Sequence, residues 1–141
     1  IYGMREALNL AILELRKNIA HIKTMENLFI NEINKSEILF KINGSPRIPG
    51  IINITFLDVD GQDLLLNLDM LGIAISYGSA CASGTSKASP VLNEIGMDKE
   101  LSKKTVRISI GKHITKENII FLVENLKALI PKKQIKGERV G

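Results

Sequence analysis

The chain has 141 residues, of which 45% are hydrophobic and 24% are charged, an ordinary composition for one globular domain with a real core. Its apolar runs are shorter than the ~20 residues that a membrane-spanning helix needs, which argues against a membrane protein. A net charge of +4 without an aromatic cluster or a nucleic-acid-binding motif argues against a nucleic-acid partner, and a single cysteine excludes an internal disulfide and fits the cytoplasm.

The first segment has apolar residues spaced by three or four positions from Met4 to Ile33. This period predicts one amphipathic helix of roughly 45 Å, whose polar face carries Glu26 among other charged residues. Such a helix is long for a chain of this size, so we expect it to link one domain to another. The predicted organisation is an interdomain helix at 1–34, a small domain at 35–131 and a flexible, solvated basic tail at 132–141.

The middle of the chain alternates short apolar runs with turn residues. Alternation and breaks at Gly and Pro predict strands, and Asp60 is placed to cap a helix. The predicted elements are a strand at 38–42, a strand at 52–56, a helix at 62–71 and a short strand at 73–75.

The last third of the chain carries three helix starts and one strand. Ser89 with Pro90, Asp98 and Thr115 are each placed to begin a helix, and residues 106–110 alternate as a strand with Arg107 on the face away from the core. The whole order predicts an α+β fold, with a small mixed or antiparallel sheet of three to four strands and helices packed on one face.

The only cysteine, Cys81, lies in residues 77–89, nine of which are Gly, Ala or Ser. Such a segment offers little apolar area, so we expect this thiol to contact water, whereas a free cysteine is usually buried. Two interpretations stay open on these residues alone, a reactive thiol and an incidental surface cysteine. His21 and His113 are distant in sequence, which disfavours a metal site and supplies no neighbouring base.

Several motifs occur in a fixed order around this cysteine. Tyr77-Gly-Ser-Ala-Cys-Ala-Ser-Gly84 is followed by Ser89-Pro-Val-Leu-Asn-Glu-Ile-Gly96 and then by Val106-Arg-Ile-Ser-Ile-Gly111, with Pro49-Gly-Ile-Ile-Asn53 upstream. Together they resemble the C-terminal small domain of a pyridoxal-phosphate-dependent cysteine desulfurase of the NifS/IscS-like group, in the class-V aminotransferase family. The chain departs from this group at Tyr77, where a small residue is usual.

The resemblance implies a chemistry and two site residues. Cys81 would be the nucleophile that takes sulfur from L-cysteine, releases L-alanine and holds a persulfide for a sulfur-acceptor or scaffold protein, as in iron–sulfur cluster assembly. Arg107 would bind the substrate α-carboxylate. Pyridoxal 5'-phosphate would be bound by a large domain upstream of residue 1 in a homodimeric full-length enzyme, since the lysine and ring-binding motifs of that domain do not occur here. The fragment alone is expected to be inactive.

Three alternatives stay open at this stage. Arg107 could form a routine surface ion pair. The parent enzyme could be a selenocysteine lyase, which shares the family. The chain could also act in isolation as a non-catalytic module that carries a persulfide or docks to a scaffold protein.

Overall fold

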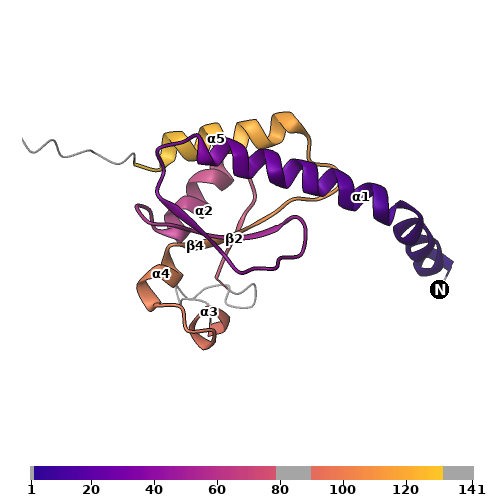
Figure 1. The fold of residues 1–141 in the computed structure, drawn as a ribbon, viewed down its shortest axis with the longest axis horizontal. Helices are drawn as coiled ribbons and strands as arrows, with labels where there is room; N and C mark the ends of the chain where they lie inside the picture. Colours follow the sequence, from indigo (N-terminus) through magenta and orange to yellow (C-terminus); the bar gives the residue numbers. More distant parts are fainter. Residues whose placement is uncertain (1, 79–89, 132–141) are drawn as a thin grey trace, which may run out of the picture.

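A four-stranded antiparallel sheet with strand order β1-β2-β4-β3 forms the centre of the computed structural model, which describes residues 2–78 and 90–131 (Figure 1). The elements in chain order are α1 (Tyr2–Asn34), β1 (Phe40–Asn43), β2 (Ile51–Phe56), α2 (Gly61–Met70), β3 (Ser76–Tyr77), α3 (Pro90–Glu94), α4 (Lys99–Lys103), β4 (Thr105–Ser109) and α5 (Lys116–Leu129). The predicted α+β fold is confirmed.

The two interior strands separate an apolar face from a polar one. Ile54 of β2 lies opposite Val106 of β4, and both are buried in the core together with apolar side chains of α1, α2 and α5. Asn53 and Arg107, one position along each strand, lie opposite one another on the other face. The three long helices therefore cover one face, while the short α3 and α4 lie beside the opposite face at one end (Figure 1).

Side-chain caps begin the helices where the sequence predicts them. Asp60 and Asp98 each accept a hydrogen bond at 2.8 Å from a backbone N–H of the first turn of α2 and α4. Thr115 forms a capping box with the third residue of α5. The predicted cap Ser89 lies outside the described residues, and α3 begins at Pro90.

The predicted strand at 73–75 is wrong, because β3 consists of Ser76–Tyr77 alone. Residues 73–75 instead line an apolar cavity of about 370 Å³, whose other walls come from the end of β4 and from α5. The backbone at 73–75 lies across this cavity from β4, so pairing starts only at Ser76, opposite Arg107.

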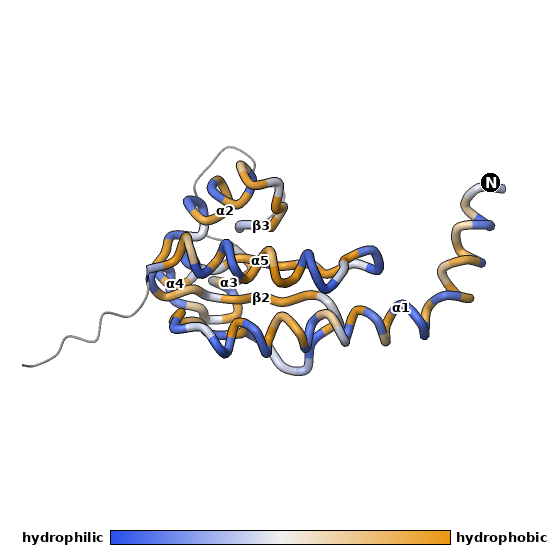
Figure 2. The backbone as a smooth tube through the Cα atoms, turned by 90° about the horizontal axis from the view of Figure 1, so that it is seen from above, coloured by the Kyte–Doolittle hydropathy of each residue, from blue (hydrophilic) through white to orange (hydrophobic). Residues whose placement is uncertain are grey.

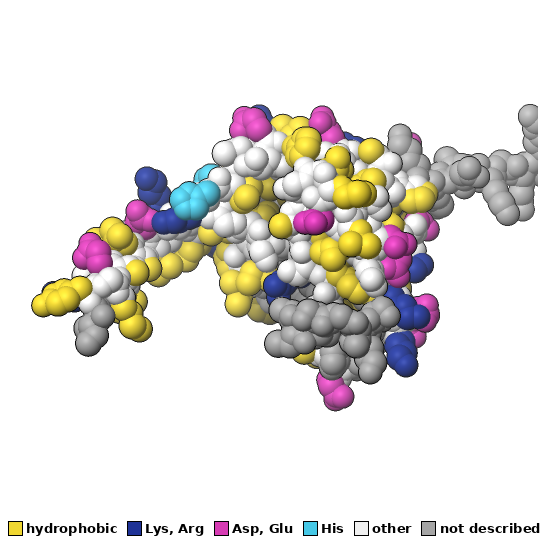
Figure 3. All heavy atoms as spheres, turned by 180° about the vertical axis from the view of Figure 1, so that it is seen from behind, with side chains coloured by type: hydrophobic (Ala, Val, Ile, Leu, Met, Phe, Trp, Pro, Cys, Tyr) yellow, Lys and Arg dark blue, Asp and Glu magenta, His cyan; other side chains and the backbone are white. Residues whose placement is uncertain are grey.

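Helix α1 confirms the predicted long helix and extends beyond the rest of the fold (Figures 1 and 2). Its apolar stripe is buried only near the C-terminal end, at Met25, Phe29 and Ile33, whereas Met4 is 82% and Leu8 59% exposed. Figure 3 shows hydrophobic side chains along the protruding part. Within the described ranges, neither α1 nor another helix combines the length and apolarity required to cross a membrane.

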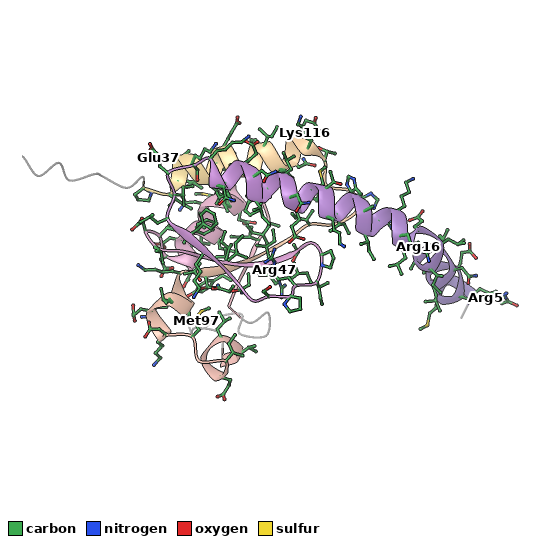
Figure 4. The ribbon with its side chains drawn as sticks, in the orientation of Figure 1. Arg5, Arg16, Glu37, Arg47, Met97 and Lys116 are labelled. Carbon is green, nitrogen blue, oxygen red and sulfur yellow. The ribbon has the colours of Figure 1, made fainter. Side chains whose placement is uncertain are left out.

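The prediction that Glu26 lies on the solvent face of α1 is wrong, since this residue is only 7% exposed. Its Oε1 accepts a hydrogen bond from Arg47 Nη2 at 3.0 Å, and its Oε2 accepts one from the Gly50 N–H at 2.8 Å. The loop before β2 therefore folds back onto α1, where Figure 4 labels Arg47. A buried carboxylate needs such partners, and here they fix the start of β2.

Replacing Gly61 with alanine is expected to destabilise the fold by about 1–3 kcal/mol, because a Cβ there overpacks the interior. This Cβ would lie 2.7 Å from Tyr77 Cδ2 and 2.9 Å from the Lys103 carbonyl oxygen. Urea denaturation of both proteins measures the change in the free energy of unfolding. Gly111→Ala is the matched control, since its Cβ would meet nothing within 4 Å. An unchanged midpoint for Gly61→Ala would contradict the close packing of α2 on Tyr77.

Candidate functional site

Arg107 lies on the interior strand β4, with its exposed side chain on the polar face of the sheet. Its Nη2 donates a hydrogen bond to Ser76 Oγ at 3.2 Å from the neighbouring β3. None of the ion pairs in the described part of the chain involves Arg107. The alternative of a routine ion pair therefore finds no partner among those residues, and the other N–H groups of the guanidinium are available for an anion.

The polar face continues from Arg107 across β2 to β1. Asn53 lies opposite Arg107 on one side and opposite Asn43 on the other. The Asn43 Nδ2 donates to Asn53 Oδ1 at 2.8 Å and to Thr55 Oγ1 at 2.9 Å. In the sequence, Asn53 falls inside the predicted strand at 52–56, whereas Asn43 lies just beyond the predicted strand at 38–42. Its position shows only from the pairing of β1 with β2, because alternation alone does not fix which residues lie opposite one another.

The predicted nucleophile Cys81 lies outside the described residues. The chain leaves the described part at Gly78, two residues after Ser76, which is the β3 partner of Arg107. A segment of five residues spans at most about 18 Å when fully extended. Covalent geometry therefore limits the distance from the Cα of Ser76 to the Cα of Cys81, whatever the path between them.

Tyr77 projects to the face opposite Ser76, towards the first turn of α2. Its half-buried ring packs against Gly61, and burial raises the pKa of its hydroxyl, as does the negative charge of Asp60. The residue at which the chain departs from the NifS/IscS-like pattern therefore fills a packing position. The two residues of β3 have separate contacts, Tyr77 with the body of the fold and Ser76 with Arg107.

The described lysines lack the environment that a Schiff-base lysine usually has. A Schiff-base lysine requires a desolvated amine with a lowered pKa, and no described lysine is buried. The pKa of Lys103 is raised, by its hydrogen bond to Glu100 and by the charge of that carboxylate. Nor do His, Asp and Glu side chains in residues 2–78 and 90–131 gather in a group that could hold a metal ion.

The two histidines take no part in the polar face around Arg107. His113 is exposed in the loop after β4. His21 lies on α1, where its Nε2 is 2.8 Å from the carbonyl oxygen of Ile114. Both are accounted for as surface and packing residues.

Comparison with known protein families identifies one matching model, described as aminotransferase class-V, which covers residues 1–122. A protein from Dictyoglomus turgidum named cysteine desulfurase IscS is 37% identical over 134 residues, which are 94% of this chain and 34% of that protein. A protein of the same name from Vibrio vulnificus is 34% identical over 94% of this chain and 32% of its own length. The chain thus spans about a third of the length of the curated relatives it matches.

Solved structures show the same fold. A NifS-like protein from Rickettsia africae superposes with a TM-score of 0.71 and 25% identity, over 84% of this chain and 31% of that one. The apo structure of a cysteine desulfurase from Thermococcus onnurineus gives a TM-score of 0.65 at 15% identity, over 86% of this chain and 28% of that one, a likeness of fold alone.

Proposed function

Since the chain belongs to the class-V aminotransferase family, we propose that it is the substrate-facing C-terminal part of a cysteine desulfurase. The observation that carries the proposal is Arg107, an exposed cation on an interior strand that has no carboxylate partner in the described residues. It lies beside the strand that leads into the segment with Cys81. The relatives named cysteine desulfurase IscS suggest the reaction in which this cation and this thiol would act.

Sulfur transfer to Cys81 is the central step of the proposal. The Cys81 thiolate attacks the sulfur of L-cysteine, an S–S bond forms, and the Cβ–S bond of the substrate breaks. The electron pair of that bond passes to the carbon side, Cβ takes up a proton, and the products are L-alanine and a persulfide on Cys81. Pyridoxal phosphate, bound by a domain upstream of this chain, would supply the electron sink for this bond cleavage.

Arg107 binds the α-carboxylate of the substrate in this proposal. A guanidinium presents a planar, permanently charged fork that can donate two parallel hydrogen bonds to one carboxylate. The interior position of β4 fixes the backbone from which this fork extends. The cation thereby orients the amino acid, while the nucleophile is supplied by the neighbouring segment.

The proposal extends to the partners of the whole protein. The full-length enzyme would act in the cytoplasm as a homodimer and pass the persulfide sulfur to an acceptor protein, such as an iron–sulfur scaffold. The 141-residue chain alone would not turn over L-cysteine, because its described residues offer no cofactor lysine.

The test uses the full-length protein loaded with pyridoxal phosphate and given L-cysteine. We expect L-alanine and sulfur to form in equal amounts, and the peptide that contains Cys81 to gain the mass of one sulfur atom before a reductant is added. The isolated 141-residue chain under the same conditions is the control and should release no alanine. Release of selenium from selenocysteine without sulfur release from cysteine would overturn the assignment in favour of a lyase.

A further inference from the structure

We propose that Asn53 supplies a second hydrogen-bond donor to the carboxylate bound by Arg107, and that Asn43 fixes the direction of this donor. The inference rests on the proposed function and deepens it, because it assigns the recognition of the substrate carboxylate to a pair of residues. Its basis is a chain of hydrogen bonds that runs along the polar face of the sheet.

This series of hydrogen bonds starts at a backbone carbonyl oxygen, which can accept a hydrogen bond but cannot donate one. The carbonyl oxygen of Leu101 accepts a hydrogen bond from Thr105 Oγ1 at 2.7 Å, which uses the single hydroxyl proton of Thr105. Thr55 Oγ1 lies 2.7 Å from Thr105 Oγ1, so Thr55 must be the donor of that bond. The lone pairs of Thr55 are then directed to Asn43, which donates to Thr55 from its Nδ2. The same Nδ2 donates to Asn53 Oδ1.

This sequence of donors determines the orientation of the Asn53 amide. Its Oδ1 faces Asn43 on β1, so its Nδ2 projects to the other side, where Arg107 of β4 is its neighbour in the register. No described residue accepts a hydrogen bond from this Nδ2, although Asn53 is half-buried. An NH₂ group that is partly removed from water and lacks a hydrogen-bond acceptor is stabilised when a ligand supplies an acceptor.

Two neighbouring donors define the class of ligand. Arg107 presents a permanent positive charge and Asn53 a neutral NH₂ group. Among the described residues, the hydrogen bond of Arg107 is to Ser76 on β3, which lies on the side of β4 away from Asn53. Donors without acceptors suit an anion with more than one oxygen atom, and a carboxylate offers two. An amide or ester of the same amino acid lacks the charge and one of the acceptor oxygens.

Binding to the full-length, cofactor-loaded protein tests the inference independently of turnover. Isothermal titration calorimetry would compare L-alanine, which carries the carboxylate, with L-alaninamide, which does not. We expect Asn53→Ala to weaken L-alanine binding about tenfold, as for the loss of one hydrogen bond to a charged group, and alaninamide binding less than about twofold. Asn125→Ala is the matched control, because the side chain of Asn125 donates to the Phe121 carbonyl within α5 and to no other residue that the structure describes.

Two further variants keep the test decisive if Asn53→Ala folds poorly. Asn53→Thr retains a strand-forming residue but not the NH₂ group, and should lose L-alanine affinity to a similar degree. Asn43→Asp replaces the amide that donates to Asn53 Oδ1 with a carboxylate, which can only accept. The amide of Asn53 should therefore rotate and present its oxygen to Arg107. We expect this positioning variant to raise the KM for L-cysteine about tenfold with kcat within about twofold of wild type.

Unchanged L-alanine binding in both Asn53 variants, or an equal loss for alaninamide, would overturn the inference. Failure of the proposed function gives a different pattern. In that case the wild-type protein would release no sulfur from L-cysteine, whereas the Asn53 variants would still lose affinity for L-alanine.

Discussion

Replacing Cys81 with alanine in the full-length protein should lower the rate of sulfur release from L-cysteine at least about a thousandfold, because the reaction would lose its proposed nucleophile. Cys81 is the only cysteine of the chain, so no second thiol within it can take over. Sulfide production with a reductant, together with mass spectrometry of the protein, measures the loss. Cys81→Ser should be equally inactive, since a hydroxyl at neutral pH is a much weaker nucleophile than a thiolate.

The same variants should keep their affinity for L-alanine, which separates the loss of the nucleophile from a loss of the binding site. Sulfur release from Cys81→Ala at a rate near that of wild type would show that another group accepts the sulfur. The proposed role of Cys81 would then be wrong, even if the protein desulfurates cysteine.

Arg107→Ala should raise the KM for L-cysteine about a hundredfold, because the substrate would lose the proposed bidentate, charge-assisted contact. Arg107→Lys should recover only part of the loss, since an ammonium group cannot form the paired contact of a guanidinium. Steady-state kinetics of the full-length protein, together with the Kd for L-alanine, measure both effects. Arg16→Ala is the matched control, because Arg16 is exposed on the protruding part of α1 (Figure 4).

A fall in kcat for Arg107→Ala with an unchanged KM would contradict a role in binding the carboxylate. Loss of folded protein is a separate outcome, which thermal denaturation detects. We expect the fold to be retained, since the side chain of Arg107 is exposed and lies outside the core cluster.

Sequence patterns predicted the elements whose burial is one-sided. Side chains of β2 and β4 point alternately to the core and to the polar face. The matching alternation of apolar and polar residues in the sequence therefore predicts both strands and places Arg107 away from the core. Asp60, Asp98 and Thr115 were found as caps because each precedes its helix by one residue. These are local signals, and they need no information about which elements pack together.

The features that were missed depend on contacts between distant parts of the chain. Glu26 follows the polar period of α1, and nothing local indicates that the loop with Arg47 folds over it. The run at 73–75 is apolar because Ile73 and Ile75 pack against the core, although these residues are not paired in the sheet. Asn43 gains significance only through the β1–β2 register. The position of Arg107 was therefore predictable, but the hydrogen bonds around it were not.

The central place of β4 in the sheet has a consequence for altering specificity. A backbone that is paired on both sides cannot shift at one residue without disturbing its neighbours, so the guanidinium of Arg107 starts from a fixed point. The polar face around it contributes little to the apolar interior. Substitutions at Asn53 and Ser76 should thus change how tightly a carboxylate is held beside Arg107 without displacing the strand, which makes this pair a practical starting point for redesign.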